Sequence, residues 1–265
     1  MIKLEINPEP EIRLTDHLIE SQISPIHKGG GKLFEIKDNP DKVVRVESFA
    51  DLEPRYKGRI DPVAVAELGQ VQYAELQTRY HIATPVEFLI GKGFDNEDVV
   101  YSIVDKVDGK DLDACEVTPE LIEQVERLYE NIAQYYLDKF SQENGFYLAD
   151  INNATQYVYG KKKGDSESHI YLVDTDLYLR DGKVALCNVV LWLFRHMASI
   201  EGKYGKKLTH AREIIKDILA TPLPNGLTEE QRATAEAIIA KTKGYMDGTI
   251  VMDDKDVHPI FSDLD

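Results

Sequence analysis

The sequence predicts an α+β fold in which a strand-rich front half precedes a helix-rich back half. Short apolar runs separated by turn residues fill most of the first hundred residues, whereas apolar residues recur at helical spacing after residue 118. A polar segment, "DKVDGKDL" from Asp105 to Leu112, joins the two halves. Because strands followed by helices are typical of α+β proteins, we expect two parts, residues 1–107 and 108–265, with a cleft between them.

Composition and charge narrow the class of partner. The chain has 265 residues, of which 47 are acidic and 31 are Lys or Arg, so its formal net charge is -16. This charge repels phosphate backbones, and we expect neither nucleic acid nor a membrane surface as a partner. Two cysteines cannot form a disulfide framework, and the beginning of the chain lacks the basic and apolar regions of a signal peptide. We therefore expect a cytoplasmic protein.

The front half is expected to contain a hairpin, a helix and two further strands. "KLFEIKD" and "KVVRVES" flank Asn39, Pro40 and Asp41, three residues that predict a turn. Asp61 and Pro62 open the helical stretch "VAVAELGQVQYAELQTRYH". "TPVEFLIG" and "DVVYSIVDKV" then predict two strands.

The back half is expected to be mainly helical. Thr118 and Pro119 are typical of a helix start, and one long helix with a core-facing apolar stripe follows them. "QYVYG" and "HIYLVDTDL" predict a strand pair, and helices follow from residue 183. The last helix begins at Thr228 with a capping box to Gln231, and Gly244 predicts its end. The apolar stripe of the long helix consists of Leu121, Val125, Leu128, Ile132, Tyr136 and Phe140.

A glycine run before the first clear strand is a candidate phosphate-binding loop. Gly29, Gly30 and Gly31 are followed by Lys32, and glycines let backbone N–H groups approach phosphate oxygens closely. The surrounding residues match neither a Walker A loop nor the dinucleotide fingerprint. A glycine run also suits a flexible turn, so the choice between these two interpretations depends on the motifs that follow it in the chain.

Arg45 is a candidate phosphate ligand, because it lies between valines in "VVRVE" on the strand that follows the glycine loop. An acid from the following helix would hold it in place, and Glu67 and Glu75 are both available. We favour Glu67, because Val71, four residues later, can pack into the core, whereas Arg79 follows Glu75 at the same spacing.

A purine could bind where the front half ends. In "VVYSIVDKVDGKDL" a buried strand gives way to a short polar link. Backbone groups exposed in such a link can form hydrogen bonds with a purine. The expected contacts are the carbonyl oxygen of Asp105 and the N–H of Val107.

Carboxylates within apolar runs are candidate catalytic and metal-binding groups. Asp150 lies in "FYLADINN", and Asp174 and Asp176 lie in "IYLVDTDL". Each aspartate alone also suits a turn. Together they are expected to point into a cleft where a cation offsets the cost of grouping carboxylates.

In this order, "GGGKLFEI", "VVRVE", the Glu-bearing helix, "YSIVDKVDGKDL", "YLADINN" and "YLVDTD" resemble the protein-kinase-like superfamily. The resemblance spans about Ile23 to Met197 and is nearest to the aminoglycoside- and choline-kinase branch or to atypical bacterial kinases. It implies a bilobal fold, with an antiparallel sheet and one helix in the N-terminal lobe and a mainly helical C-terminal lobe. It also implies bound ATP and Mg²⁺.

The resemblance implies a role for each motif residue. Asp150 matches the catalytic aspartate that orients the attacking hydroxyl and accepts its proton. Asp174 matches the magnesium-binding aspartate, and Asp176 replaces the glycine that usually follows and could be a second ligand. Arg45 takes the place of the strand lysine, whose geometry differs from that of arginine.

Two departures from the family pattern bear on activity. Leu148 takes the place of the usual histidine, and Thr155 stands where the second metal-binding residue, an asparagine, is expected. A shortened loop could let Asn153 serve instead, and we place it ahead of Asn152 and Thr155. The opposing interpretation is a loop that has lost its ligand.

The leading hypothesis is an ATP- and Mg²⁺-dependent phosphotransferase that acts on a hydroxyl of a small molecule or an atypical protein substrate. Its partners would be a nucleotide and this acceptor. The alternative is a pseudokinase, a binding or scaffolding module that keeps the fold without turnover. An effector kinase with a protein target is a third hypothesis.

Overall fold

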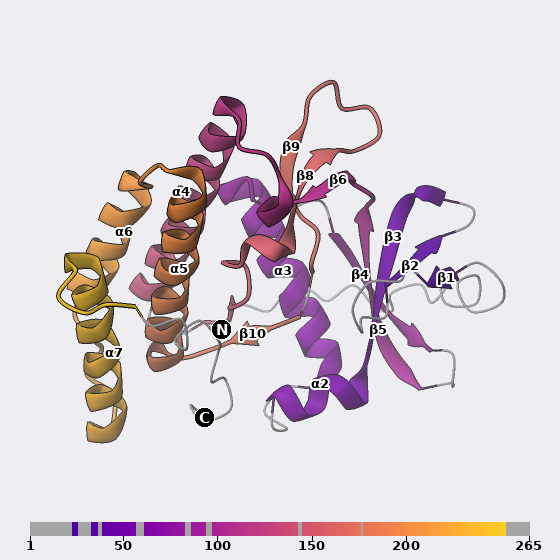
Figure 1. The fold of residues 1–265 in the computed structure, drawn as a ribbon. Helices are drawn as coiled ribbons and strands as arrows, with labels where there is room; N and C mark the ends of the chain where they lie inside the picture. Colours follow the sequence, from indigo (N-terminus) through magenta and orange to yellow (C-terminus); the bar gives the residue numbers. More distant parts are fainter. Residues whose placement is uncertain are drawn as a thin grey trace.

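The structure is a computed structural model that describes residues 23–25, 33–36, 39–56, 61–82, 86–93, 97–142, 145–175 and 177–252. It is a mixed α/β protein with small antiparallel sheets. Figure 1 shows the largest sheet on one side and helices α5 (Lys183–Tyr204), α6 (Thr209–Ala220) and α7 (Glu229–Asp247) on the other. Helix α3 (Pro62–Tyr80) runs between them (Figure 1).

The largest sheet is antiparallel and has the strand order β1-β2-β3-β5-β4. Because side chains alternate across a strand, β3 presents Val44 and Val46 to one buried cluster and Arg45 and Glu47 to the opposite face. The expected hairpin is confirmed, since β2 pairs antiparallel with β3, but the expected turn at Asn39 is wrong, because this residue already begins β3. The strands are β1 (Ile23–Pro25), β2 (Leu33–Ile36), β3 (Asn39–Ser48), β4 (Val86–Lys92) and β5 (Asp98–Asp105).

Helix α3 (Pro62–Tyr80) is attached to the edge of this sheet. Asp61 caps its first turn by accepting a hydrogen bond of 3.0 Å from the backbone N–H of Ala64. Gln70 then binds the edge strand, since its Nε2 donates to the carbonyl of Val86 and its Oε1 accepts from the N–H of Phe88. A short helix that the sequence did not indicate, α2 (Phe49–Tyr56), precedes α3.

Helix α4 (Pro119–Ser141), which Thr118 caps as expected, lies in the larger hydrophobic cluster together with residues of α3, α5, α6 and α7. The capping box at Thr228 is also confirmed. The expected helix end at Gly244 is wrong, because the helix continues to Asp247. Ile250 folds back onto Gly244, and its N–H donates to the carbonyl of that glycine. The helices are α5 (Lys183–Tyr204), α6 (Thr209–Ala220) and α7 (Glu229–Asp247).

Two small sheets join the chain segments between α3 and α5. Strands β6 (Asp108–Asp111), β8 (Tyr157–Lys161) and β9 (His169–Leu172) pair in the order β6-β8-β9. Strands β7 (Tyr147–Leu148) and β10 (Leu179–Arg180) form a second pair. The β8–β9 pair was expected, whereas β6 was read as a linker and the β7–β10 pair was not predicted.

Two glycines face each other where β6 meets β8. Gly109 lies opposite Gly160, and a Cβ atom on Gly160 would lie 2.6 Å from the Cα of Gly109. We expect Gly160→Ala to lower the free energy of unfolding by about 2 kcal/mol, because the obstacle is backbone and cannot move aside. Urea denaturation measures this change, and Gly202→Ala, where a Cβ meets open space on α5, is the control that should not destabilise the fold.

Helix α5 is long and apolar enough to cross a membrane when judged by length and composition alone. Within its apolar window, however, 61% is buried inside the structure. A core helix of a folded protein passes the same test, so this finding is weak evidence for a membrane span.

Candidate functional site

Two loops that carry the predicted acids are held side by side by hydrogen-bonded strand pairs at both of their ends. At one end Leu148 pairs with Leu179, and at the other Tyr157 pairs with Leu172. The loop after β7 carries Asp150, and the loop after β9 carries Asp174. Since both loops run between the same two pairs of strands, the structure brings together the two segments that bear these carboxylates.

Backbone hydrogen bonds add to these strand pairs. The N–H of Ala149 donates to the carbonyl of Tyr178 at 3.0 Å. At the other end, the carbonyl of Gln156 accepts from the N–H groups of Val173 and Asp174 at 3.0 and 3.3 Å. The position of each loop therefore depends directly on the other.

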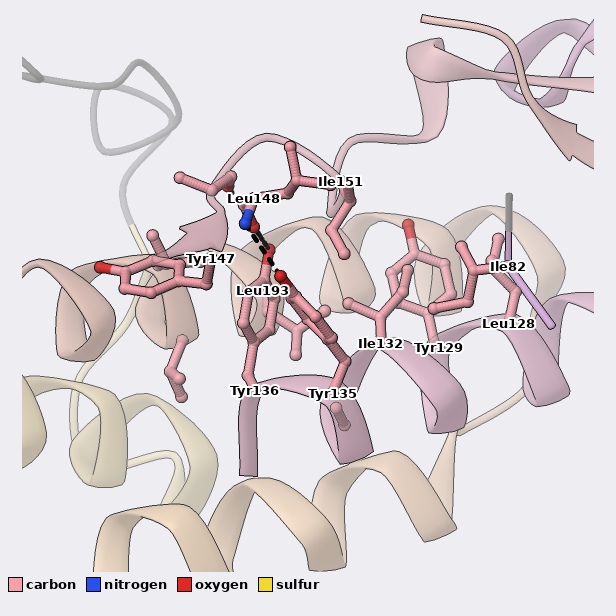
Figure 2. Close-up of a cluster of buried hydrophobic side chains, with 14 of the residues drawn as sticks. Ile82, Leu128, Tyr129, Ile132, Tyr135, Tyr136, Tyr147, Leu148, Ile151 and Leu193 are labelled. Carbon is pink, nitrogen blue, oxygen red and sulfur yellow. Dashed lines mark hydrogen bonds between the residues drawn. The ribbon is translucent and has the colours of Figure 1, made fainter. Parts of the chain in front are cut away.

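Buried tyrosine hydroxyls form hydrogen bonds with the backbone on both sides of Asp150, and Figure 2 shows two of them, Tyr135 and Tyr136, at Leu148. The N–H of Leu148 donates to the hydroxyl of Tyr135 at 2.9 Å, and Tyr136 donates to the carbonyl of Leu148 at 3.1 Å. On the other side of Asp150, the hydroxyl of Tyr157 donates to the carbonyl of Ile151 at 2.5 Å. These contacts fix the backbone on both sides of the candidate catalytic residue.

These tyrosine hydroxyls remain protonated and therefore able to donate. Burial raises the pKa of Tyr135, Tyr136 and Tyr157 well above the ordinary value. The carboxylate of Asp150 is a further cause of the raised pKa at Tyr136 and Tyr157. Asp150 is thus close enough to act electrostatically on two of the residues that position its loop.

Arg45 on β3 reaches across to the loop after β9 and forms an ion pair with the carboxylate of Asp174. Its neighbour on the same face of the strand, Glu47, is 6% exposed and accepts a hydrogen bond of 3.4 Å from the N–H of Leu177. The sheet therefore contacts the candidate metal-binding segment at two points.

The reason for preferring Glu67 as the partner of Arg45 is wrong. Val71, expected in the core, is 59% exposed, and Glu67 lies on the same exposed face of α3. Glu75 is committed elsewhere, since it forms an ion pair of 2.5 Å with the buried Lys139 of α4. The structure instead gives Arg45 an ion pair with Asp174.

The three candidates for a second metal ligand have different surroundings. Asn152 is buried, and its side-chain N–H group faces the carbonyl of Val189 on α5 at 3.5 Å. Asn153 is half-buried and caps the short helix Ala154–Gln156, its Oδ1 accepting from the N–H of Thr155 at 3.1 Å. The side chain of Thr155 is exposed. Of the three, Asn153 combines an amide oxygen with access to the surface of the loop.

The segment expected to bind a purine lies at the end of β5. The carboxylate of Asp105 forms ion pairs with Lys42 at 2.5 Å and with Lys162 of the β8–β9 loop at 3.4 Å. These contacts link the largest sheet to the smaller one. Val107, which lies between β5 and β6 in the chain, is half-buried.

Several expected site residues lie outside the residues that the structure describes. They are Gly29, Gly30, Gly31 and Lys32 of the glycine loop, and Asp176. The roles proposed for them stay predictions.

Two surface cavities are lined by residues of other segments. One, of about 690 Å³, lies between α4, β9 and the end of α3, and the other, of about 430 Å³, lies between α4 and the α5–α6 connection. Neither is lined by a residue of the two acidic loops.

The described donor atoms are of the kind that Mg²⁺ binds. Asp174 offers a carboxylate and Asn153 an amide oxygen, and Mg²⁺ is commonly held by one or two carboxylates together with water and substrate phosphates. Within the described part of the chain, no three His, Cys, Asp or Glu side chains gather as a metal cluster. The donor set fits an ion shared with a phosphate better than a closed protein site.

Sequence reasoning missed the buried groups that support the site. Tyr135, Tyr136 and Tyr157 were assigned to a helix or strand, without any role at the loop. The only sequence signal is that tyrosines stand at core positions, where a buried hydroxyl needs a partner. That signal does not say which backbone group the partner is.

No family model matches the chain, and no curated protein matches it significantly. Among solved structures, it is similar to a microcompartment-associated aminopropanol kinase, at 10% identity over 86% of this chain and 93% of that chain, with a TM-score of 0.39. It is also similar to WbdD, at 14% identity over 83% of this chain and 50% of that chain, with a TM-score of 0.36.

Proposed function

We propose that the protein is an ATP- and Mg²⁺-dependent phosphotransferase of kinase-like, bilobal organisation, with residues 1–107 and 108–265 as its two lobes. The observation that carries this proposal is the pairing of the two acidic loops, with Arg45 of the sheet in contact with Asp174. The order of these groups along the chain is the order of the kinase-like motifs.

Each of the three charged groups has a role in this proposal. Asp150 orients the acceptor hydroxyl and takes up its proton as the phosphoryl group is transferred. Asp174, with Asn153, holds Mg²⁺, which neutralises charge on the phosphate oxygens when it is bound. Arg45 binds the phosphates of the nucleotide once it has left Asp174, because its planar guanidinium suits phosphate oxygens.

The acceptor that fits best is a small molecule with a hydroxyl group. Helix α5 begins at Lys183, soon after Asp174. A peptide acceptor usually needs a longer segment at this place to seat it, and a short segment leaves room for a small substrate.

Magnesium-dependent stabilisation by nucleotide tests the proposal. We expect ATP with Mg²⁺ to raise the Tm of the full chain more than ATP alone, since a ligand bound only by the folded state stabilises it. Asp174→Asn should remove the increment that Mg²⁺ adds. Asp217→Asn, at an exposed site on α6, is the matched control and should keep it.

A pseudokinase is the second candidate, and one observation favours it. The carboxylate of Asp174 is neutralised by Arg45, and Asn153 is engaged as a helix cap, so both donors have protein partners. If Mg²⁺ adds no stabilisation in the wild-type protein, the scaffold interpretation replaces the phosphotransferase.

A further inference from the structure

We infer that Gln72 of α3 and Tyr135 of α4 are positioning residues, which fix the loop that bears Asp150 by a relay of hydrogen bonds. The catalytic role of this relay rests on the proposed function. That α3 fixes the position of the loop through the relay does not depend on the proposed function.

The relay consists of two hydrogen bonds in series. The backbone N–H of Leu148 donates to the hydroxyl of Tyr135 at 2.9 Å, and this hydroxyl donates to Oε1 of Gln72 at 2.8 Å. Figure 2 shows the first of these bonds at the base of the loop. Gln72 is 6% exposed, Tyr135 0% and Leu148 1%, so water cannot replace a lost partner.

Hydrogen-bonding capacity fixes the direction of the relay. A backbone N–H can only donate, so Tyr135 must accept from Leu148 and direct its own proton elsewhere. Gln72 supplies the acceptor. Because burial raises the pKa of Tyr135 well above its ordinary value, the hydroxyl keeps this proton at neutral pH.

The relay acts close to the candidate catalytic residue. Leu148 stands two residues before Asp150, at the place where the kinase-like motif has a histidine, and its apolar side chain offers no hydrogen bond. Tyr136 donates to the carbonyl of Leu148 and, at 3.5 Å, to that of Ala149. Both backbone groups of Leu148 are therefore held by tyrosines of α4, and Gln72 connects one of these tyrosines to α3.

Helix α3 also contacts the loop that bears Asp174. Gly69, three residues before Gln72, lies so close to Leu177 that a Cβ atom there would clash with the leucine side chain. On the same helix, Gln70 is bound to the edge strand β4. One rigid helix thus joins the sheet to both acidic loops, and a shift of α3 displaces both.

The variant Tyr135→Phe tests the relay. In Tyr135→Phe the Leu148 amide loses its buried acceptor, so we expect this amide to exchange with deuterium at least about tenfold faster. For the phosphotransferase we expect kcat to fall about tenfold with the KM for ATP unchanged, because misplacement of a catalytic group lowers the rate rather than binding. Gln72→Leu should give the same pattern with a smaller change.

Tyr80→Phe is the matched control. Tyr80 lies at the same α3–α4 interface and its ring packs edge-on against Tyr135, but its hydroxyl donates to Asp138 at 2.6 Å and not to the loop. The same loss of one buried hydroxyl should leave Leu148 exchange and kcat within about twofold of wild type, because Tyr80→Phe keeps the ring that packs against Tyr135 and removes only a hydroxyl bonded to Asp138.

Three outcomes separate the two hypotheses. Unchanged Leu148 exchange in Tyr135→Phe overturns the relay, whether or not the protein transfers phosphate. Faster exchange in a wild-type protein that transfers no phosphate supports the relay and overturns only the proposed function. In the double variant that combines Tyr135→Phe with Gln72→Leu, the two single effects on Leu148 exchange should not multiply, because both break the same relay. If they do multiply, α3 does not act through Tyr135, and its part in the relay is overturned.

Discussion

Asp150→Asn is expected to lower kcat for phosphoryl transfer by about a thousandfold, the largest effect on activity that we predict. Asparagine keeps the shape of the side chain but cannot take up a proton from the acceptor hydroxyl. The loop itself should stay in place, because its backbone is held by Tyr135, Tyr136 and Tyr157. Steady-state kinetics with ATP and a hydroxyl acceptor measure the change.

Nucleotide binding separates this prediction from a loss of folding. We expect Asp150→Asn to bind ATP with Mg²⁺ as the wild type does, whereas Asp174→Asn should lose the contribution of the metal. Asp217→Asn on the surface of α6 should behave as wild type in both assays. A variant at Asp150 with full turnover would remove this residue from the chemistry.

Lys183→Met is expected to lower the free energy of unfolding by about 3 kcal/mol, the largest effect on stability that we predict. The side-chain ammonium of Lys183 donates to the backbone carbonyls of Lys139 and Phe140 at 3.0 and 2.5 Å, and also to that of Gln142. It thereby satisfies carbonyl groups that the C-terminal end of α4 leaves without helical partners. Burial lowers the pKa of Lys183, which reflects the cost of holding its charge there.

Methionine fills the same space but leaves these carbonyls without a donor. The loss should appear in urea denaturation as a lower midpoint with an unchanged slope. Lys203→Met provides a matched control on the same helix, since Lys203 also donates to two carbonyls, those of Leu112 and Asp113. Lys203 is exposed, so water can replace it, and we expect a loss of at most about 1 kcal/mol. Equal losses in the two variants would show that burial is not the cause.

Local signals in the sequence were sufficient for the starts of α3, α4 and α7. Thr118 and Thr228 were predicted as caps and Asp61 as the start of a helix, and each accepts a capping hydrogen bond from a backbone N–H group. A cap is formed between residues three apart, so its physics is contained in a few neighbouring residues. The same holds for β8 and β9, where alternation and a short polar loop predicted a strand pair.

Predictions that depended on distant contacts were less successful. Val71 was placed in the core and is exposed, because apolar residues surround α3 without marking which side faces the sheet. Gly244 was read as a helix end, although it remains helical and makes room for Ile250. In each case the outcome depends on how the residue packs against another segment of the fold. The residues that precede it in the chain do not predict that packing.

By itself, the sequence determined the alternation of strands and helices, the caps and the two acidic motifs, because these follow from the spacing and chemistry of near neighbours. Only the tertiary structure decided that Arg45 forms an ion pair with Asp174, that Glu75 forms one with Lys139, and that buried tyrosines hold the loop at Asp150. These contacts join residues far apart in the chain. They form because a buried charge or hydroxyl must find a partner wherever the packed fold provides one.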